Sequence, residues 1–136
     1  MPRIFGLSLL GWIVTSIAFF LLGYLFFGVI FLDNMTELMG YDENTAMNFG
    51  FGSQLTLGFV NVAVTSLGIG LLLKWLKAED MVTAIKYGLF AALVFAITTE
   101  AYAWVYGNFP IEMAIIDGVY ILIGYSMVAA IWSIFD

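Results

Sequence analysis

The sequence of 136 residues contains no cysteine, no histidine and only four basic residues. Without cysteine, the chain can form neither disulfides nor thiolate metal sites. The absence of histidine removes the commonest general base and the usual transition-metal ligand. We therefore expect no enzymatic activity, no cofactor and no metal ion. We also expect no nucleic-acid partner, because so few basic residues cannot form a basic patch.

Charged residues of both signs are scarce, at 10% of the chain, whereas hydrophobic residues make up 63% and the mean hydropathy is +1.05. The hydrophobic residues form four long stretches, at residues 4–31, 53–75, 83–106 and 111–135. Each stretch reaches the roughly 20 residues that a helix needs to cross about 30 Å of hydrocarbon. The sequence predicts an all-α fold: one domain, residues 1–136, that forms a polytopic bundle of four transmembrane helices in a lipid bilayer.

The few basic residues predict the orientation of the bundle. Arg3 precedes the first stretch, and Lys74, Lys77 and Lys86 surround the link between the second and the third. The first link, residues 32–52, carries acidic residues and no basic ones. Basic residues mark the cytoplasmic side of a membrane protein. Both termini are therefore expected in the cytoplasm, and the acidic first link outside.

The first link is the only long connection. Asn34 and Glu37 have the spacing of a capping box, Leu38 and Met39 follow, and Gly40 is a typical helix stop. This pattern predicts a short amphipathic helix on the outer surface, followed by a turn-rich stretch. The carboxylates of the link could bind calcium, but their spacing is not that of a calcium loop. A solvated acidic loop is the simpler interpretation.

Small residues recur at helical spacing inside the four stretches. Such rows let helices approach closely in a bilayer, where no hydrophobic effect drives their association. We expect the following rows to face one another: Ser8, Gly11, Thr15 and Ala18; Gly58, Asn61, Thr65 and Gly68; Gly88, Ala92, Ala96 and Glu100; and Asp117 with Gly124.

Glu100 and Asp117 are the residues that packing explains least. Counted from the outer ends of their helices, both lie about 10 Å down at 1.5 Å per residue. Asn61 and Tyr24 reach a similar level on the other two helices, and no lysine or arginine does. Since an ionised carboxylate in hydrocarbon is unfavourable, such groups face protein or water and are commonly functional.

Two interpretations of this polar group remain open. Carboxylates without a countercharge can share a proton or hold a cation, which is what a proton- or cation-handling site requires. Alternatively, a protonated carboxyl group hydrogen-bonded to Asn61 or Tyr24 simply holds the bundle together. An aspartyl-type catalytic dyad is conceivable from two acids, but the depth and the lack of positioning motifs argue against it.

Segments 23–28 (Gly-Tyr-Leu-Phe-Phe-Gly) and 39–43 (Met-Gly-Tyr-Asp-Glu) resemble the beginning of the DUF1761 family of small, uncharacterised bacterial membrane proteins. Segments 106–110 (Tyr-Gly-Asn-Phe-Pro) and 115–120 (Ile-Ile-Asp-Gly-Val-Tyr) are similar to its last loop and fourth helix. The chain departs from that pattern at residues 25–26, where the family has Trp-Tyr. The resemblance implies four helices and a bacterial inner membrane, and it places Asp117 within a shared motif.

Two functions fit these features. The first is proton- or cation-linked transport or permeation by a homo-oligomer, because four short helices leave little room for a pathway in one protomer. Glu100 would bind the proton or cation beside Asp117, and Asn61 and Tyr24 would donate or accept hydrogen bonds. The alternative is an accessory or assembly subunit of a larger membrane complex, which small size and glycine-rich helix faces would suit.

Overall fold

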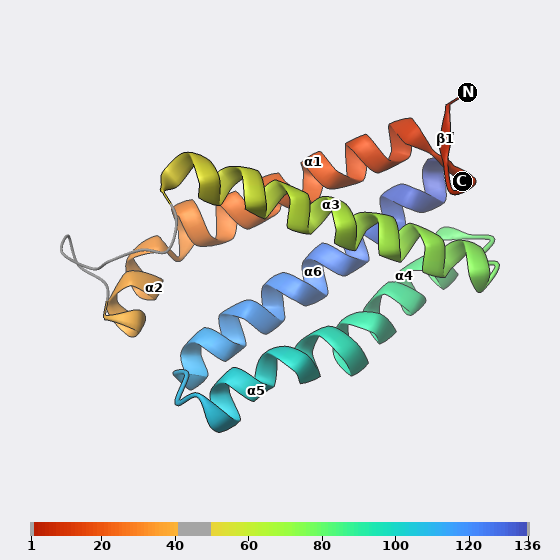
Figure 1. Ribbon diagram of the computed structural model, residues 1–136. Coiled ribbons are helices and arrows are strands. Elements are labelled where there is room, and N and C mark those ends of the chain that lie inside the picture. The colour runs from red at the N-terminus through yellow and green to blue at the C-terminus, as the bar shows by residue number, and fades with distance from the viewer. Residues whose placement is uncertain (1, 41–49, 136) are drawn as a thin grey trace.

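The computed structural model describes residues 2–40 and 50–135. Apart from a short N-terminal hairpin, the described residues form helices and their links (Figure 1). Four helical segments are long and apolar enough to cross a membrane: Leu9–Ile30, Gly52–Trp75, Met81–Tyr106 and Ile111–Phe135. The predicted all-α bundle is confirmed, and the protein is a multi-pass membrane protein.

The elements follow one another along the chain with little between them. They are β1 Arg3–Ile4, β2 Leu7–Ser8, α1 Leu9–Leu25, η1 Phe26–Ile30, α2 Leu32–Met39, α3 Phe51–Trp75, α4 Met81–Ala91, η2 Ala92–Ile97, α5 Thr98–Tyr106 and α6 Ile111–Phe135, where η marks a π-helical stretch.

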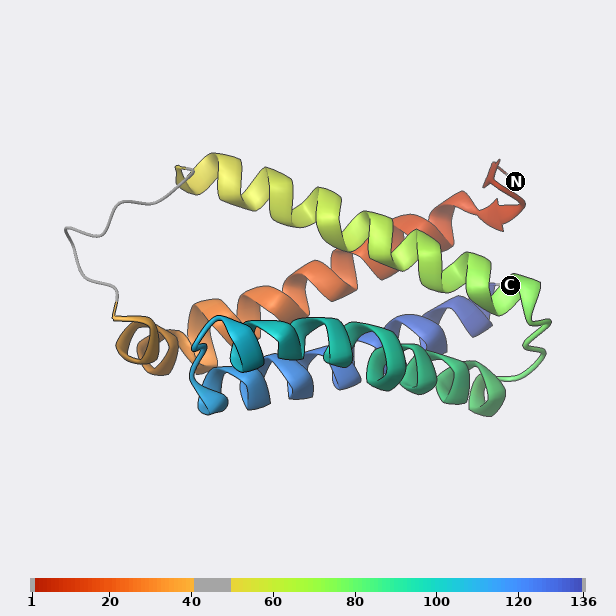
Figure 2. The same ribbon diagram turned by 60° about the horizontal axis from the view of Figure 1, so that its bottom comes forward.

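Helix α6 lies in the middle of the bundle. Helix α1 packs along one side of it and α4 along the other, while α3 packs mainly on α1. Both ends of the chain and the α3–α4 link lie at one end of the bundle, which we call the terminal end (Figure 1, Figure 2). Helix α2 and the α5–α6 link lie at the opposite end, the loop end.

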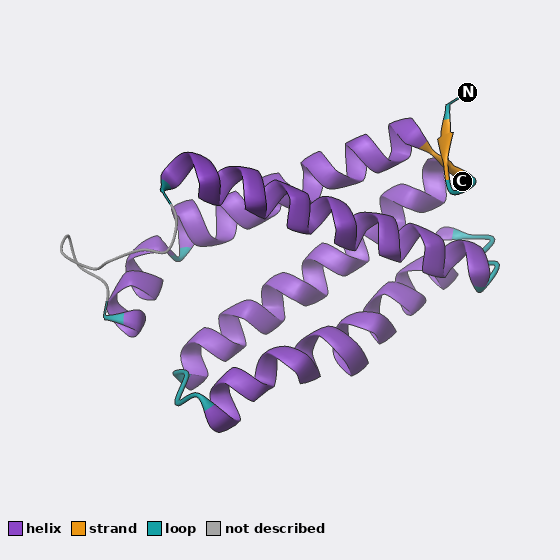
Figure 3. Ribbon diagram, viewed as in Figure 1, coloured by secondary structure: helices purple, strands orange, loops and turns teal. Residues whose placement is uncertain are grey.

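The chain begins with a hairpin and not with a helix (Figure 3). Strands β1 and β2 pair antiparallel, and the turn residues Phe5 and Gly6 have φ angles of 51° and 81°. Ser8 then caps α1, because its hydroxyl oxygen accepts a hydrogen bond from the Gly11 amide at 3.1 Å. Helix α1 therefore begins at Leu9, whereas the hydropathy of the sequence predicts that the first helix begins at residue 4. Hydropathy cannot detect this turn, because the hairpin is as apolar as the helix.

The short helix predicted in the first link is present as α2. It ends, as predicted, at Gly40, whose φ of 73° is the left-handed conformation typical of a helix stop. It begins earlier than predicted: Phe31 occupies the N-cap position and no side chain caps the helix. The Asn34–Glu37 capping box is thus not formed, because both residues already lie inside the helix. The rest of the predicted acidic loop, with Asp42 and Glu43, lies outside the described residues.

The third membrane span is interrupted by a π-helical stretch, η2, between α4 and α5. A π-helix bonds residue i to i+5, so the residues after it are rotated relative to those before it. Gly88 and Ala92 are buried, as expected for the small-residue row, but Glu100 is exposed. The predicted single row therefore ends at η2, and Glu100 points to a different face of the span.

Close packing extends from the middle of the bundle to the terminal end. A Cβ atom at Gly88 would lie 2.9 Å from the Tyr125 carbonyl oxygen, which shows how closely α4 approaches α6. Gly70 of α3 similarly accommodates the Trp132 indole ring. The buried core consists of Leu7, Phe19, Ile69, Leu73, Ala84, Val128, Ala129 and Trp132. Helix α3 contributes Ile69, Gly70 and Leu73 to this packing, whereas Asn61 and Gly68 of the predicted row are exposed.

Candidate functional site

A cavity of about 440 Å³ lies between the third and the second membrane span. Asn61 and Thr65 of α3 line it on one side, and Thr99 and Glu100 of α5 on the other. Phe19 of α1, Phe95 of η2, and Tyr120 and Tyr125 of α6 add aromatic rings to its lining. The cavity thus combines polar walls with aromatic surface.

The cavity exists because α3 and α5 separate toward the loop end. Helix α3 follows α1 and reaches α4 only near the terminal end, so its path diverges from α5 (Figure 1, Figure 2). The rotation introduced by η2 then turns Glu100 toward this space, away from the small residues that face α6. The local π-helix and the splayed α3 together position the site.

Of the predicted polar residues, the structure brings Asn61 and Glu100 into this one cavity. Within residues 2–40 and 50–135, neither side chain has a hydrogen-bond partner. The neighbouring threonines already donate their hydroxyl protons to carbonyl oxygens of their own helices: Thr65 to Asn61 at 3.1 Å and Thr99 to Phe95 at 2.6 Å. The Asn61 amide and the Glu100 carboxyl group therefore have unused hydrogen-bonding capacity in the cavity, as do the hydroxyl groups of Tyr120 and Tyr125.

Asp117 is half-buried on α6 and is not among the residues that line the cavity. It lies close enough to Glu100 for the two carboxylates to interact electrostatically. Neither acid forms an ion pair with a lysine or arginine in the described part of the chain, and all lining residues other than Glu100 are uncharged. Two acidic side chains thus lie near each other without a basic partner among the described residues.

The structure places the last predicted residue, Tyr24, elsewhere. Its side chain is 55% exposed, and its ring lies beside Gly28 of the same helix. Two tyrosines that sequence reasoning missed, Tyr120 and Tyr125, line the cavity in its place. The spacing of Tyr120, three residues after Asp117, could have identified it, because residues i and i+3 share one face of a helix.

The comparison with known families agrees with this architecture. A family model described as a protein of unknown function, DUF1761, matches residues 5–133. The chain belongs to the DUF1761 family. The DUF1761 match spans all four membrane helices and includes both carboxylates, which confirms the resemblance seen in the sequence. No curated protein and no solved structure matches the chain, so these comparisons supply no activity.

The arrangement is suited to binding a proton or a cation. The Glu100 carboxyl group faces the cavity, that of Asp117 lies nearby, and the aromatic faces of the lining attract cations in their own right. Among the described residues no cluster of three acidic side chains could hold a metal ion. A carboxyl group in an aromatic lining of this kind is chemically able to bind and release a proton or a single cation.

Proposed function

We propose that this protein binds a proton or a small cation at Glu100 and transfers it across the membrane. The observation that carries this proposal is that Glu100, within the apolar span Met81–Tyr106, lines a cavity without a hydrogen-bond partner or a countercharge among the described residues. A carboxylate in that position is unfavourable unless it is protonated, hydrated or neutralised by a cation. A group that must gain and lose a positive charge is what proton- or cation-linked transport requires.

The cavity occupies only part of the membrane thickness in a single chain. Toward the terminal end the bundle is closed by Trp132 and the glycines that pack against it. A complete pathway across the membrane therefore requires the surface of a second chain. We propose that the protein forms a homo-oligomer in which this cavity faces the partner copy. By the distribution of Arg3, Lys74 and Lys77, the terminal end lies in the cytoplasm. We propose the bacterial inner membrane as the protein's location.

Transport can be tested with purified protein in liposomes that contain a pH-sensitive dye. The wild type should show cation-driven proton flux, and Glu100→Gln should reduce it to the rate of empty liposomes, because the amide cannot bind the proton. Glu112→Gln is the matched control: it makes the same charge change at the start of α6, outside the cavity. Equal flux in the wild type and in Glu100→Gln would contradict the proposal.

The gap between α3 and α5 also favours the second candidate, an accessory subunit of a larger complex. A polar cavity open between two helices could receive a helix of another protein, whose polar group would pair with Asn61 and Glu100. Purification in a mild detergent separates the two cases. A larger partner in fixed stoichiometry favours the accessory role, whereas a homo-oligomer without other proteins favours transport.

A further inference from the structure

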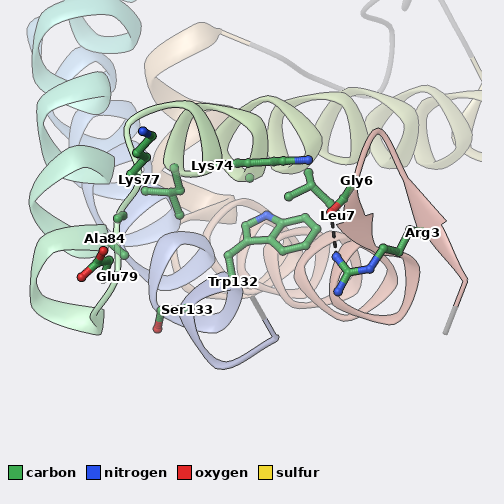
Figure 4. Close-up of a pocket in the computed structure, with 12 residues that line it drawn as sticks. Arg3, Gly6, Leu7, Lys74, Lys77, Glu79, Ala84, Trp132 and Ser133 are labelled. Atoms are coloured by element: carbon green, nitrogen blue, oxygen red, sulfur yellow. Dashed lines mark hydrogen bonds between the residues drawn. The ribbon is translucent and has the colours of Figure 1, made fainter.

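A second cavity, of about 500 Å³, lies at the terminal end and shares no lining residue with the first (Figure 4). Three of the four basic residues of the chain line it: Arg3, Lys74 and Lys77. The fourth, Lys86, does not. The positive-inside rule accounts for basic residues on this side of the membrane, but it does not require that they surround one cavity.

Specific backbone features hold these basic residues in place. The Lys74 amine donates a hydrogen bond to the Phe5 carbonyl oxygen at 3.3 Å and so ties α3 to the hairpin turn. An Arg3 guanidinium nitrogen donates to the Gly6 carbonyl oxygen at 2.7 Å, as Figure 4 shows. Gly6 allows this close approach, because a Cβ atom there would collide with the Lys74 amine. The hairpin therefore brings Arg3 to the side of Lys74.

Lys77 is positioned by the way in which α3 ends. The Lys77 amide donates to the Lys74 carbonyl at 3.1 Å, and the Ala78 amide donates to the Leu73 carbonyl at 3.0 Å. This pair of bonds is the Schellman motif, in which the residue at the Lys77 position adopts the left-handed conformation, here with φ of 56°. Glycine is the residue that usually occupies such a position. A lysine is unfavourable in this backbone conformation, which indicates that its positive charge has a functional role.

Much of the remaining lining is apolar and lies near the ends of the membrane spans. Leu7, Leu73 and Trp132 are buried beneath the basic residues. Phe5 and Trp75, the chain neighbours of Gly6 and Lys74, are each 70% exposed. Exposed aromatic residues at the end of a span are typical of the interface between hydrocarbon and headgroups. The cavity thus presents positive charge to headgroups and apolar surface toward acyl chains.

We infer that this cavity binds the phosphate group of an anionic membrane lipid. Basic pockets between membrane helices on the cytoplasmic side bind such headgroups, and the attraction is worth about 1 kcal/mol for each basic residue near the surface. The lining also contains one carboxylate, Glu79, which would repel a phosphate and accept hydrogen bonds from hydroxyl groups. The site therefore prefers a singly charged phosphodiester with a hydroxylated headgroup, such as phosphatidylglycerol, to a doubly charged phosphomonoester.

Lipid binding can be measured by native mass spectrometry of the detergent-solubilised protein, titrated with phosphatidylglycerol, phosphatidylcholine or inorganic phosphate. Phosphatidylglycerol should bind most tightly. Lys77→Gly should weaken its binding about fivefold, and Lys77→Gly with Lys74→Gln about 25-fold, at about 1 kcal/mol per charge. Lys77→Gly is chosen because glycine suits the left-handed backbone, so a loss of binding cannot be attributed to a damaged helix end.

Two further variants complete the design. Lys77→Arg keeps the charge and should keep the affinity, and Lys86→Gln, which removes a charge outside the cavity, should leave the affinity unchanged. Equal binding of the two lipids, or an equal loss in Lys86→Gln and Lys77→Gly, would overturn the inference. If inorganic phosphate binds as tightly as the lipid and competes with it, the ligand is free phosphate and the lipid assignment fails.

Discussion

Helix α3 passes through two different environments along its length. Near the terminal end, Ile69, Gly70 and Leu73 are buried against α6 and the hairpin. Toward the loop end, Leu57 and Asn61 are exposed, and the helix has separated from α5 (Figure 2). The same helix is therefore part of a closely packed core at one end and one wall of an open polar cavity at the other.

The comparison shows which interactions close the bundle. Near the terminal end two tryptophans reach α3: the Trp132 indole N–H donates to the Ser66 carbonyl and that of Trp12 to the Ala63 carbonyl, each at 2.8 Å. The hydroxyl groups of Ser16 and Ser66, in contrast, are buried without a partner in the described structure. Hydroxyl pairing thus does not hold this end together. This end is held together by large aromatic rings that pack against small residues, as Trp132 does against Gly11 and Gly70. The helices separate in the part of the bundle that lacks such contacts.

Of the substitutions that test this difference between the two ends, Trp132→Ala should have the largest effect on stability. The side chain is 1% exposed, fills the space at Gly11 and Gly70, and bonds to α3. Its removal leaves a cavity and takes away the hydrogen bond to the Ser66 carbonyl, and it should lower the free energy of unfolding by about 3–5 kcal/mol. Trp75→Ala is the control: that side chain is 70% exposed, and its loss should change stability by less than about 0.5 kcal/mol. Unfolding in mixed micelles measures both, and equal losses would show that Trp132 does not hold the packed end together.

A smaller effect of the same kind is expected from a pair of glycines. Gly88→Ala places a methyl group 2.9 Å from the Tyr125 carbonyl oxygen, so α4 and α6 must separate. Such overpacking should lower stability by about 1–3 kcal/mol. Gly68→Ala meets nothing within 4 Å and should raise stability by up to about 1 kcal/mol through helix propensity. The signs of the two changes should therefore differ in the same unfolding measurement, and a stabilising Gly88→Ala would refute the close contact.

The sequence predicted the four helices well, because apolar runs of this length have few alternatives in a bilayer. It also indicated Gly40 as a stop for α2. The hairpin was missed, since Ile4, Phe5 and Leu7 differ little in hydropathy from the helix that follows. Only the positive φ angles of the turn and the cap at Ser8 separate the two. Local backbone geometry of this kind leaves no periodic trace in the sequence.

The candidate site could be predicted only in part, for a similar reason. Counting residues from the helix ends placed Asn61 and Glu100 close enough to meet, because rise per residue is nearly constant. Rotation about the helix axis is not constant, since η2 interrupts the span before Glu100. The sequence therefore predicted how far along its helix each polar residue lies, but it did not predict in which direction the side chain points. Tyr24 lies away from the cavity, and Tyr120 and Tyr125 were recognised only in the structure.

The smallest predicted effect concerns the link that closes the terminal end, where Asp80 occupies the N-cap position of α4. The Thr83 hydroxyl lowers the pKa of the Asp80 carboxyl below its ordinary value, and the Thr83 amide adds to this. Because the pKa is lower in the folded chain, the stabilisation is present above the unfolded pKa of about 3.9 and is lost as pH falls through the folded pKa. Thr83→Val removes the hydroxyl and should raise the Asp80 pKa, whereas Thr83→Ser keeps it and should leave the pKa low. Carboxyl NMR titration in micelles measures this, and an unchanged Asp80 pKa in Thr83→Val would show that the hydroxyl is not the cause.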